Sequence, residues 1–133
     1  MQKTKILIIE DEALVAITLK RGLQRAGYEV CGVAATGEEA VEIARKEAPH
    51  VMIVDIHLMG EVDGLEAARQ IKTFSSANLI FTTGYQDADL KASALALHPL
   101  AYLLKPVEAP MIDRLLRAHH IGGSYVNVCS PSC

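Results

Sequence analysis

The chain has 133 residues, of which 50% are hydrophobic and 22% are charged, and its net charge is −3. This length favours one domain with a substantial core and leaves no room for a second catalytic or DNA-binding module. The charge argues against direct nucleic-acid binding, which depends on basic residues that neutralise phosphates. Charges also interrupt every apolar run before the roughly 20 residues that a membrane span needs. Because the first residues lead into a predicted strand without a signal-peptide pattern, we expect a cytoplasmic protein with no membrane partner.

Apolar runs alternate with amphipathic helical patterns along the chain. The pattern predicts strands over residues 6–9, 28–34, 51–54, 79–82 and 102–104. It predicts a helix after each strand, over residues 12–26, 37–46, 65–74, 87–97 and from 110 onward. The first, third, fourth and fifth strand patterns are short and bulky, and polar residues follow them. Such runs are typical of strands buried on both faces of a parallel sheet.

Local signals support several helix boundaries. Thr36 and Glu39 form a capping-box pattern at the start of the second helix. Gly27 is placed to end the first helix, since glycine favours the left-handed conformation found there. The apolar positions at helical spacing in the first and last helices are Val15, Leu19, Leu23 and Ala26, and Met111, Leu115 and Ala118.

Five strand and helix pairs predict an α/β fold, a doubly wound parallel sheet with helices on both faces. The expected flavodoxin-like strand order is 2-1-3-4-5, with a switch point between the first and third strands. Asp11 and Asp55 follow these two strands, so we expect them to flank the crevice at the carboxyl edge. Thr83 and Lys105 follow the fourth and fifth strands and should lie along the same edge.

The residues gathered at this edge favour phosphate and metal chemistry. Glu10, Asp11 and Asp55 would repel one another unless a cation shared the site. Oxygen ligands of this kind suit Mg²⁺, which also binds phosphate oxygens. Lys105 supplies a flexible positive charge and Thr83 a hydroxyl donor. Together they provide what phosphoryl transfer to a carboxylate requires.

The order and spacing of these motifs resemble the receiver domain of two-component response regulators over about residues 5–118. The matching motifs are Ile-Ile-Glu-Asp-Glu at Glu10 and Asp11, Ile-Val-Asp-Ile at Asp55, Asp63-Gly64, Thr82-Thr83-Gly84, and Tyr-Leu-Leu-Lys-Pro from Tyr102 to Pro106. Each motif alone is weak, but the set is highly specific. The resemblance implies a receiver domain over residues 1–119 and a C-terminal tail or linker over residues 120–133.

The resemblance also implies roles for the acidic residues. Asp55 would accept a phosphoryl group from a phosphohistidine of a histidine kinase or phosphotransfer protein. Asp11 would bind Mg²⁺ directly, Glu10 would bind it through water, and the backbone carbonyl of His57 would be a further ligand. A glutamate at position 10 departs from the commoner aspartate of the family and lengthens one metal arm without removing its charge.

A switch is implied as well. Thr83 would move toward the phosphoryl group, Lys105 would pair with it, and Tyr102 would turn inward to fill the space that Thr83 leaves. The peptide bond between Lys105 and Pro106 is expected to be cis. The face formed by the fourth helix, fifth strand and fifth helix would then change its affinity for an output domain, a partner protein or a second copy of the chain.

Other features of the sequence qualify this interpretation. The loop over residues 58–64 is longer than in many receivers. His57 and Tyr85 lie two residues after Asp55 and Thr83, positions that tend to gate water access in the family, so we expect slow dephosphorylation.

Such a domain would be a signalling switch with self-phosphorylation and self-dephosphorylation chemistry only, not an enzyme. Two alternatives are a static pseudo-receiver interaction module and a phosphatase that forms an aspartyl phosphate.

Overall fold

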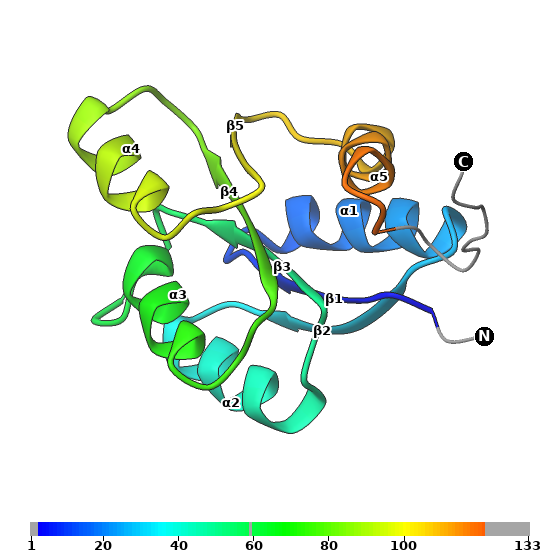
Figure 1. The fold of residues 1–133 in the computed structure, drawn as a ribbon, viewed down its shortest axis with the longest axis horizontal. Helices are drawn as coiled ribbons and strands as arrows, with labels where there is room; N and C mark the ends of the chain where they lie inside the picture. Colours follow the sequence, from blue (N-terminus) through cyan, green and yellow to red (C-terminus); the bar gives the residue numbers. More distant parts are fainter. Residues whose placement is uncertain (1–2, 59, 122–133) are drawn as a thin grey trace.

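The computed structural model describes residues 3–58 and 60–121, in which strands and helices alternate (Figure 1). In chain order the elements are β1 (Lys5–Ile9), α1 (Ala13–Arg25), β2 (Glu29–Ala34), α2 (Gly37–Glu47), β3 (Val51–Asp55), α3 (Gly64–Lys72), β4 (Asn78–Thr83), α4 (Ala88–Leu95), β5 (Ala101–Leu104) and α5 (Ala109–Ala118). All strand pairs are parallel, and the order is β2-β1-β3-β4-β5. The predicted doubly wound sheet and its strand order are confirmed.

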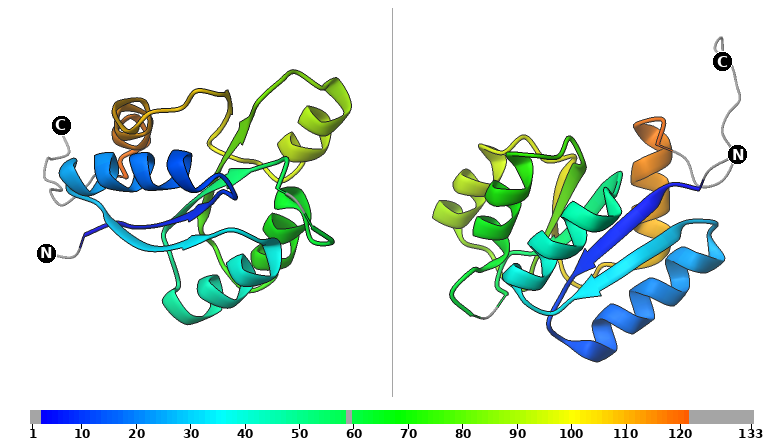
Figure 2. Two further views of the ribbon diagram at one scale, coloured as in Figure 1. Left: turned by 180° about the vertical axis from the view of Figure 1, so that it is seen from behind. Right: turned by 90° about the horizontal axis from the view of Figure 1, so that it is seen from below.

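Helices cover both faces of the sheet, and successive residues of β1 point into two different cores. Leu7 and Ile9 pack with residues of α2, α3 and α4, whereas Ile6 and Ile8 pack with residues of α1 and α5. This alternation follows from the two-residue period of a strand. Figure 2 shows α1 and α5 together on one face and α2 and α3 on the other.

The fifth strand departs from the prediction that its residues are buried on both faces. The first three residues of β5 are half-buried, and Leu104 is 49% exposed. β5 is an edge strand that pairs only with β4 in the described sheet. An edge strand lacks a neighbour on one side, so an apolar run there need not be covered on both faces.

The inner faces of α1 and α5 agree only in part with the apolar positions marked in the sequence, since Leu19 and Leu23 are buried as predicted but others are not. Val15 is 38% exposed and Met111 is 36% exposed, and Ala118 is exposed too. The buried residues are Ala16, Leu19 and Leu23 in α1, and Ala109, Ile112 and Leu116 in α5. Apolar residues surround much of α1, and in α5 the apolar side is wider than the stripe that is buried. The packing between helices and sheet, and not the helical period alone, therefore decides which stripe is buried.

The N-terminus of α2 carries the predicted capping box. The Thr36 hydroxyl accepts a hydrogen bond from the Glu39 backbone N–H at 3.1 Å. In return the Glu39 side chain accepts one from the backbone N–H of Ala35 at 2.8 Å, one residue before the cap. Gly27 has a φ of 101° after α1, which agrees with its predicted role in ending that helix.

Replacing Thr36 with alanine is expected to lower the free energy of unfolding by about 1 kcal/mol, because the Glu39 N–H then loses its partner. Urea denaturation measures the change. Thr36→Ser is the matched control, since it keeps the hydroxyl and should stay close to the wild type. Equal losses in both variants would show that the methyl group, and not the cap, stabilises this turn.

The described chain continues past α5 to Ile121. Its backbone N–H donates a 2.7 Å hydrogen bond to the Leu116 carbonyl, and its side chain packs against the α1 and α5 core. The predicted tail over residues 120–133 lies outside the described residues from position 122 onward. None of the helices in residues 3–58 and 60–121 combines the length and apolar character that crossing a membrane demands.

Candidate functional site

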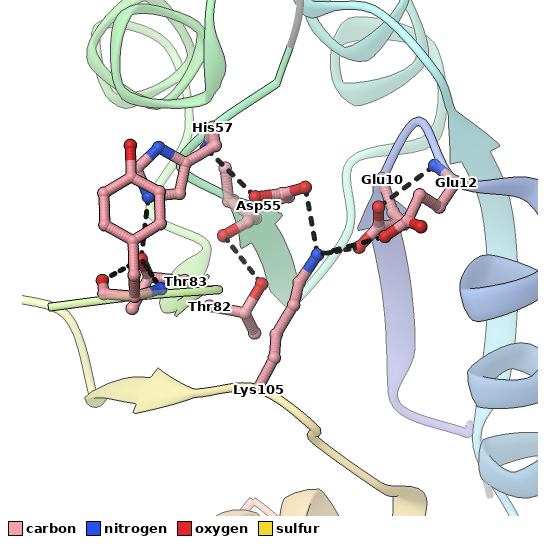
Figure 3. A network of polar contacts seen from close by, with 9 residues as sticks. Glu10, Glu12, Asp55, His57, Thr82, Thr83 and Lys105 are labelled. Carbon is pink, nitrogen blue, oxygen red and sulfur yellow. Dashed lines mark hydrogen bonds and ion pairs between the residues drawn. The ribbon is translucent and has the colours of Figure 1, made fainter.

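The carboxyl edge of the sheet gathers the polar residues that follow the strands. Glu10 and Asp11 come directly after β1, and Asp55 is the last residue of β3. Thr83 ends β4, and Lys105 follows β5. Because the strands are parallel and neighbouring registers pair Ile9 of β1 with Val54 of β3, these side chains meet at one edge. Figure 3 shows Glu10, Asp55, Thr83 and Lys105 there.

The three predicted metal-binding carboxylates lie together. One carboxylate oxygen each from Glu10, Asp11 and Asp55 falls within 4.8 Å of the others. Glu10 is 6% exposed and Asp55 is 5% exposed, whereas Asp11 is not buried. Clustered hard oxygen donors with one side open to solvent fit a Mg²⁺ ion that keeps several waters. The residues therefore suit the expected cation, with Glu10, Asp11 and Asp55 as the groups that would hold it.

Lys105 bridges two of the carboxylates. Its Nζ lies 2.9 Å from Glu10 Oε1 and 3.1 Å from Asp55 Oδ2. Glu12 lies at 4.0 Å from the same nitrogen, and its backbone N–H donates to Glu10 Oε2 at 3.0 Å. The peptide bond between Lys105 and Pro106 is cis, as predicted. Lys105 was predicted to lie along this edge as a flexible positive charge, and the structure pairs it with both Asp55 and Glu10.

The electrostatics of this cluster follow from burial and charge. Burial is the largest influence on Glu10, and together with the neighbouring Asp55 charge it raises the Glu10 pKa despite the Lys105 hydrogen bond. Burial is the largest single influence on Lys105 and disfavours its charged form, but the hydrogen bonds to Glu10 and Asp55 and the charges of these carboxylates together outweigh it and raise the Lys105 pKa. The lysine thus stays charged and partly offsets the repulsion between the carboxylates.

Thr83 lies at the site but directs its hydroxyl elsewhere. The residue is 2% exposed, and its hydroxyl donates a hydrogen bond to the Tyr85 carbonyl at 2.8 Å. His57 Nε2 lies 2.8 Å from the same oxygen. Within residues 3–58 and 60–121 the hydroxyl makes no hydrogen bond to Asp55. The predicted donor is therefore present at the edge, with its proton given to the backbone.

His57 is tied to Asp55 through its backbone. The His57 N–H donates to Asp55 Oδ1 at 2.9 Å, so the first turn after β3 folds back over the carboxylate. The sequence singled out His57 for its carbonyl and, with Tyr85, as a gate for water. It did not predict the hydrogen bond from the ring to Thr83, because no residue spacing indicates which way a loop side chain points. The metal role of the His57 carbonyl stays a prediction.

Tyr102 lies in β5 and packs against the core on the side of α4. Its hydroxyl is buried without a hydrogen-bond partner among the described residues, and Lys91 Nζ lies 5.9 Å from the centre of its ring. A buried unpaired hydroxyl is costly, which makes this ring a candidate for rearrangement. Its predicted role in a switch remains a prediction.

Gly64 lies so close to the Asp55 backbone that there is no room for a side chain at this position. A β-carbon at Gly64 would overlap the backbone carbonyl oxygen of Asp55. Asp63 caps α3 by accepting a hydrogen bond from the Glu66 N–H at 2.8 Å. The Asp63-Gly64 pair therefore starts α3 and lets that helix approach the backbone of Asp55.

Comparison with known proteins agrees with this geometry. The family model of the response regulator receiver domain matches residues 6–117. The transcriptional regulatory protein PdtaR of Mycobacterium tuberculosis is 38% identical over 102 residues, which are 77% of this chain and 49% of that protein. The chain thus spans about half the length of the curated relatives that it matches.

Solved structures show the same fold. The signal receiver domain of a modulated diguanylate cyclase from Desulfovibrio desulfuricans has a TM-score of 0.82 and 38% identity, covering 88% of this chain and 93% of that one. A response regulator from Burkholderia pseudomallei, solved with a phosphorylated aspartic acid, a calcium ion and citrate, has a TM-score of 0.74 and 32% identity, covering 82% and 64%. With a family match that runs from β1 into α5, this chain belongs to the receiver domains of two-component response regulators.

Proposed function

We propose that the domain accepts a phosphoryl group on the Asp55 carboxylate from a phosphohistidine of a histidine kinase or phosphotransfer protein. The observation that carries the proposal is the cluster of three carboxylates within 4.8 Å, with Lys105 bound to two of them. The Burkholderia pseudomallei relative, which contains a phosphorylated aspartic acid and a calcium ion, supports this chemistry for the family.

Each residue of the site would have a separate role in this reaction. A carboxylate oxygen of Asp55 attacks the phosphorus, the P–N bond to the donor histidine breaks, and the electron pair stays on the imidazole nitrogen. Lys105 lies where it can move from the carboxylate to a phosphoryl oxygen. Mg²⁺, when bound by Glu10, Asp11 and Asp55, would supply charge neutralisation on the phosphoryl oxygens.

The expected consequence is a switch at the face made by α4, β5 and α5. The Thr83 hydroxyl would donate its hydrogen bond to a phosphoryl oxygen in place of the Tyr85 carbonyl. Tyr102 would then turn inward to fill the space that Thr83 leaves. Each of the three elements carries an exposed large apolar side chain, Leu95 at 46%, Leu104 at 49% and Met111 at 36%. This surface supports contact with an output domain, a partner protein or a second copy. Differential affinity for two conformations is what makes such a switch work.

The alternatives have less support. A static pseudo-receiver would be expected to lose an acidic, acceptor, threonine or lysine position, and Asp11, Asp55, Thr83 and Lys105 are all retained. A phosphatase of the haloacid dehalogenase type would place an aspartate two residues after the nucleophile, where this chain has His57. We therefore propose a signalling domain in the cytoplasm, and not an enzyme acting on other substrates.

Incubation with a small phosphodonor and Mg²⁺ should increase the intact mass of the wild type by one phosphoryl group. Asp55→Asn should remain unmodified, because an amide lacks the nucleophilic oxygen charge. Asp89→Asn, at an exposed position in α4, is the matched control and should react like the wild type. Chelation of Mg²⁺ should prevent the reaction. A folded, metal-binding wild type that stays unmodified would contradict the proposal and favour the static module.

A further inference from the structure

A chain of contacts outside the carboxylate cluster holds the Thr83 hydroxyl. His57 Nε2 lies 2.8 Å from Thr83 Oγ1, and the same oxygen lies 2.8 Å from the Tyr85 carbonyl oxygen. The rings of His57 and Tyr85 stack, with centroids 4.3 Å apart and planes 20° from parallel. Figure 3 shows the His57 side chain reaching down to Thr83 beside Asp55.

The direction of these hydrogen bonds follows from counting protons. A carbonyl oxygen only accepts, so the single hydroxyl proton of Thr83 is directed to the Tyr85 carbonyl. The Tyr85 N–H approaches Thr83 Oγ1 at 3.4 Å and brings a second proton. His57 Nε2 must therefore carry a hydrogen and donate it to Thr83, because a bare nitrogen would face an oxygen with no proton to offer.

We propose that His57 is a positioning residue that, together with Tyr85, holds the Thr83 hydroxyl away from Asp55 in the unphosphorylated protein. The inference rests on the proposed function, in which Thr83 must donate to a phosphoryl oxygen on Asp55. For that, Thr83 has to release the Tyr85 carbonyl and lose its alignment with the imidazole N–H. The contacts among His57, Thr83 and Tyr85, which we call the threonine latch, stabilise the resting arrangement.

Two further observations support the latch. The backbone N–H of His57 is bound to Asp55 Oδ1 at 2.9 Å, which fixes the start of the side chain. Tyr85 is 57% exposed, so its ring lies over the imidazole from the solvent side without being held in the core. Stacking thus couples His57, which donates to the Thr83 hydroxyl, to Tyr85, whose carbonyl accepts the Thr83 proton. Each of the two rings restrains the other.

The first test needs no phosphorylation. Nitrogen NMR of the His57 ring, in the metal-free wild type at a pH where imidazole is neutral, should show the Nε2–H tautomer as the major form. Tyr85→Leu, which removes the stacked ring but keeps the backbone carbonyl, should shift this resonance toward that of a solvent-exposed histidine. A predominant Nδ1–H tautomer in the wild type would overturn the latch, whatever the protein does with phosphate.

The second test measures the effect on the switch. Beryllofluoride with Mg²⁺ imitates a phosphoryl group on an aspartate, and its affinity can be followed by an NMR titration of the full chain. His57→Phe keeps a ring for stacking but loses the N–H, so it should bind beryllofluoride roughly two- to tenfold more tightly, the range expected for one hydrogen bond. Tyr85→Leu should change affinity in the same direction. His119→Phe, at an exposed position beyond α5, should match the wild type.

The outcomes separate the latch from the proposed function. Weaker binding in His57→Phe would show that the imidazole assists the phosphorylated state and would overturn the latch, as would unchanged binding in both His57→Phe and Tyr85→Leu. A wild type that does not bind beryllofluoride would contradict the phosphoacceptor role itself. If His57→Phe is misfolded by circular dichroism, Tyr85→Leu decides the affinity test, since its exposed ring makes little contribution to the core.

Discussion

Replacing Lys105 with methionine is expected to lower the free energy of unfolding by about 2 kcal/mol in metal-free buffer at neutral pH. Glu10 and Asp55 are 6% and 5% exposed, and the lysine ammonium lies within 3.1 Å of both carboxylates. Removing it leaves two buried negative charges that repel each other. The loss should fall below the roughly 3–5 kcal/mol of a fully buried pair, because the Lys105 side chain is 21% exposed. Chemical denaturation measures the difference.

If repulsion between Glu10 and Asp55 destabilises Lys105→Met, two further results are expected. Adding Asp55→Asn to Lys105→Met should recover part of the lost stability, because it removes one of the repelling charges. Saturating Mg²⁺ should stabilise Lys105→Met more than it stabilises the wild type, since the ion replaces the missing positive charge. Lys46→Met, an exposed lysine of α2, is the control and should change stability by less than about 0.5 kcal/mol. A Lys105→Met protein as stable as the wild type, without metal, would show that the lysine does not offset the carboxylate repulsion.

The sequence was sufficient to place the site because strand ends are easy to read in a parallel sheet. Short apolar runs end at Glu10, Asp55, Thr83 and Lys105 within one or two residues of the observed strand ends. Parallel pairing then requires all of these ends to meet at one edge. Neither step depends on side-chain detail, which is why the cluster could be predicted before its distances were known.

Helix orientation was less predictable, and α1 shows the reason. Leu14, Val15, Ala16 and Ile17 are consecutive apolar residues, so the sequence does not single out one stripe. The structure buries Ala16 and leaves the other three exposed, Leu14 at 77%. Contact with α5 contributes to this choice: a β-carbon at Gly22 would lie 2.6 Å from that of Ala109, so the two helices approach closely there.

The contacts of the threonine latch also could not be predicted from the sequence. His57 and Tyr85 follow the strands in loop segments, where neither the two-residue nor the helical period governs side-chain direction. Their stacking depends on the backbone path of two separate loops that meet only because β3 and β4 are neighbours. The sequence could name both residues as neighbours of the site, but it could not assign the Thr83 hydroxyl to the Tyr85 carbonyl.

Gly64→Ala is expected to impair both folding and phosphoryl acceptance. The added methyl group would overlap the Asp55 carbonyl oxygen, a backbone atom held in the sheet and unable to turn aside like a side chain. Relief requires either α3 or the end of β3 to move, and we expect a loss of about 3 kcal/mol in the free energy of unfolding, at the upper end of the range for overpacking. Because Asp55 itself moves in the second case, phosphorylation by a small phosphodonor should slow even in the fraction that remains folded.

Gly84→Ala provides the matched control for stability. A β-carbon at Gly84 meets no atom within 4 Å, so the same chemical change should alter the free energy of unfolding by less than about 0.5 kcal/mol. Urea denaturation of the two variants, with intact-mass phosphorylation of Gly64→Ala, separates a steric effect at Asp55 from a general effect of replacing glycine. Equal and small losses in both variants would contradict the close approach of α3 to the Asp55 backbone. A large loss at Gly64 alone would show that the Asp63-Gly64 pair lets α3 approach the backbone of Asp55, the proposed phosphoacceptor. The glycine would then be part of the site although it has no functional group.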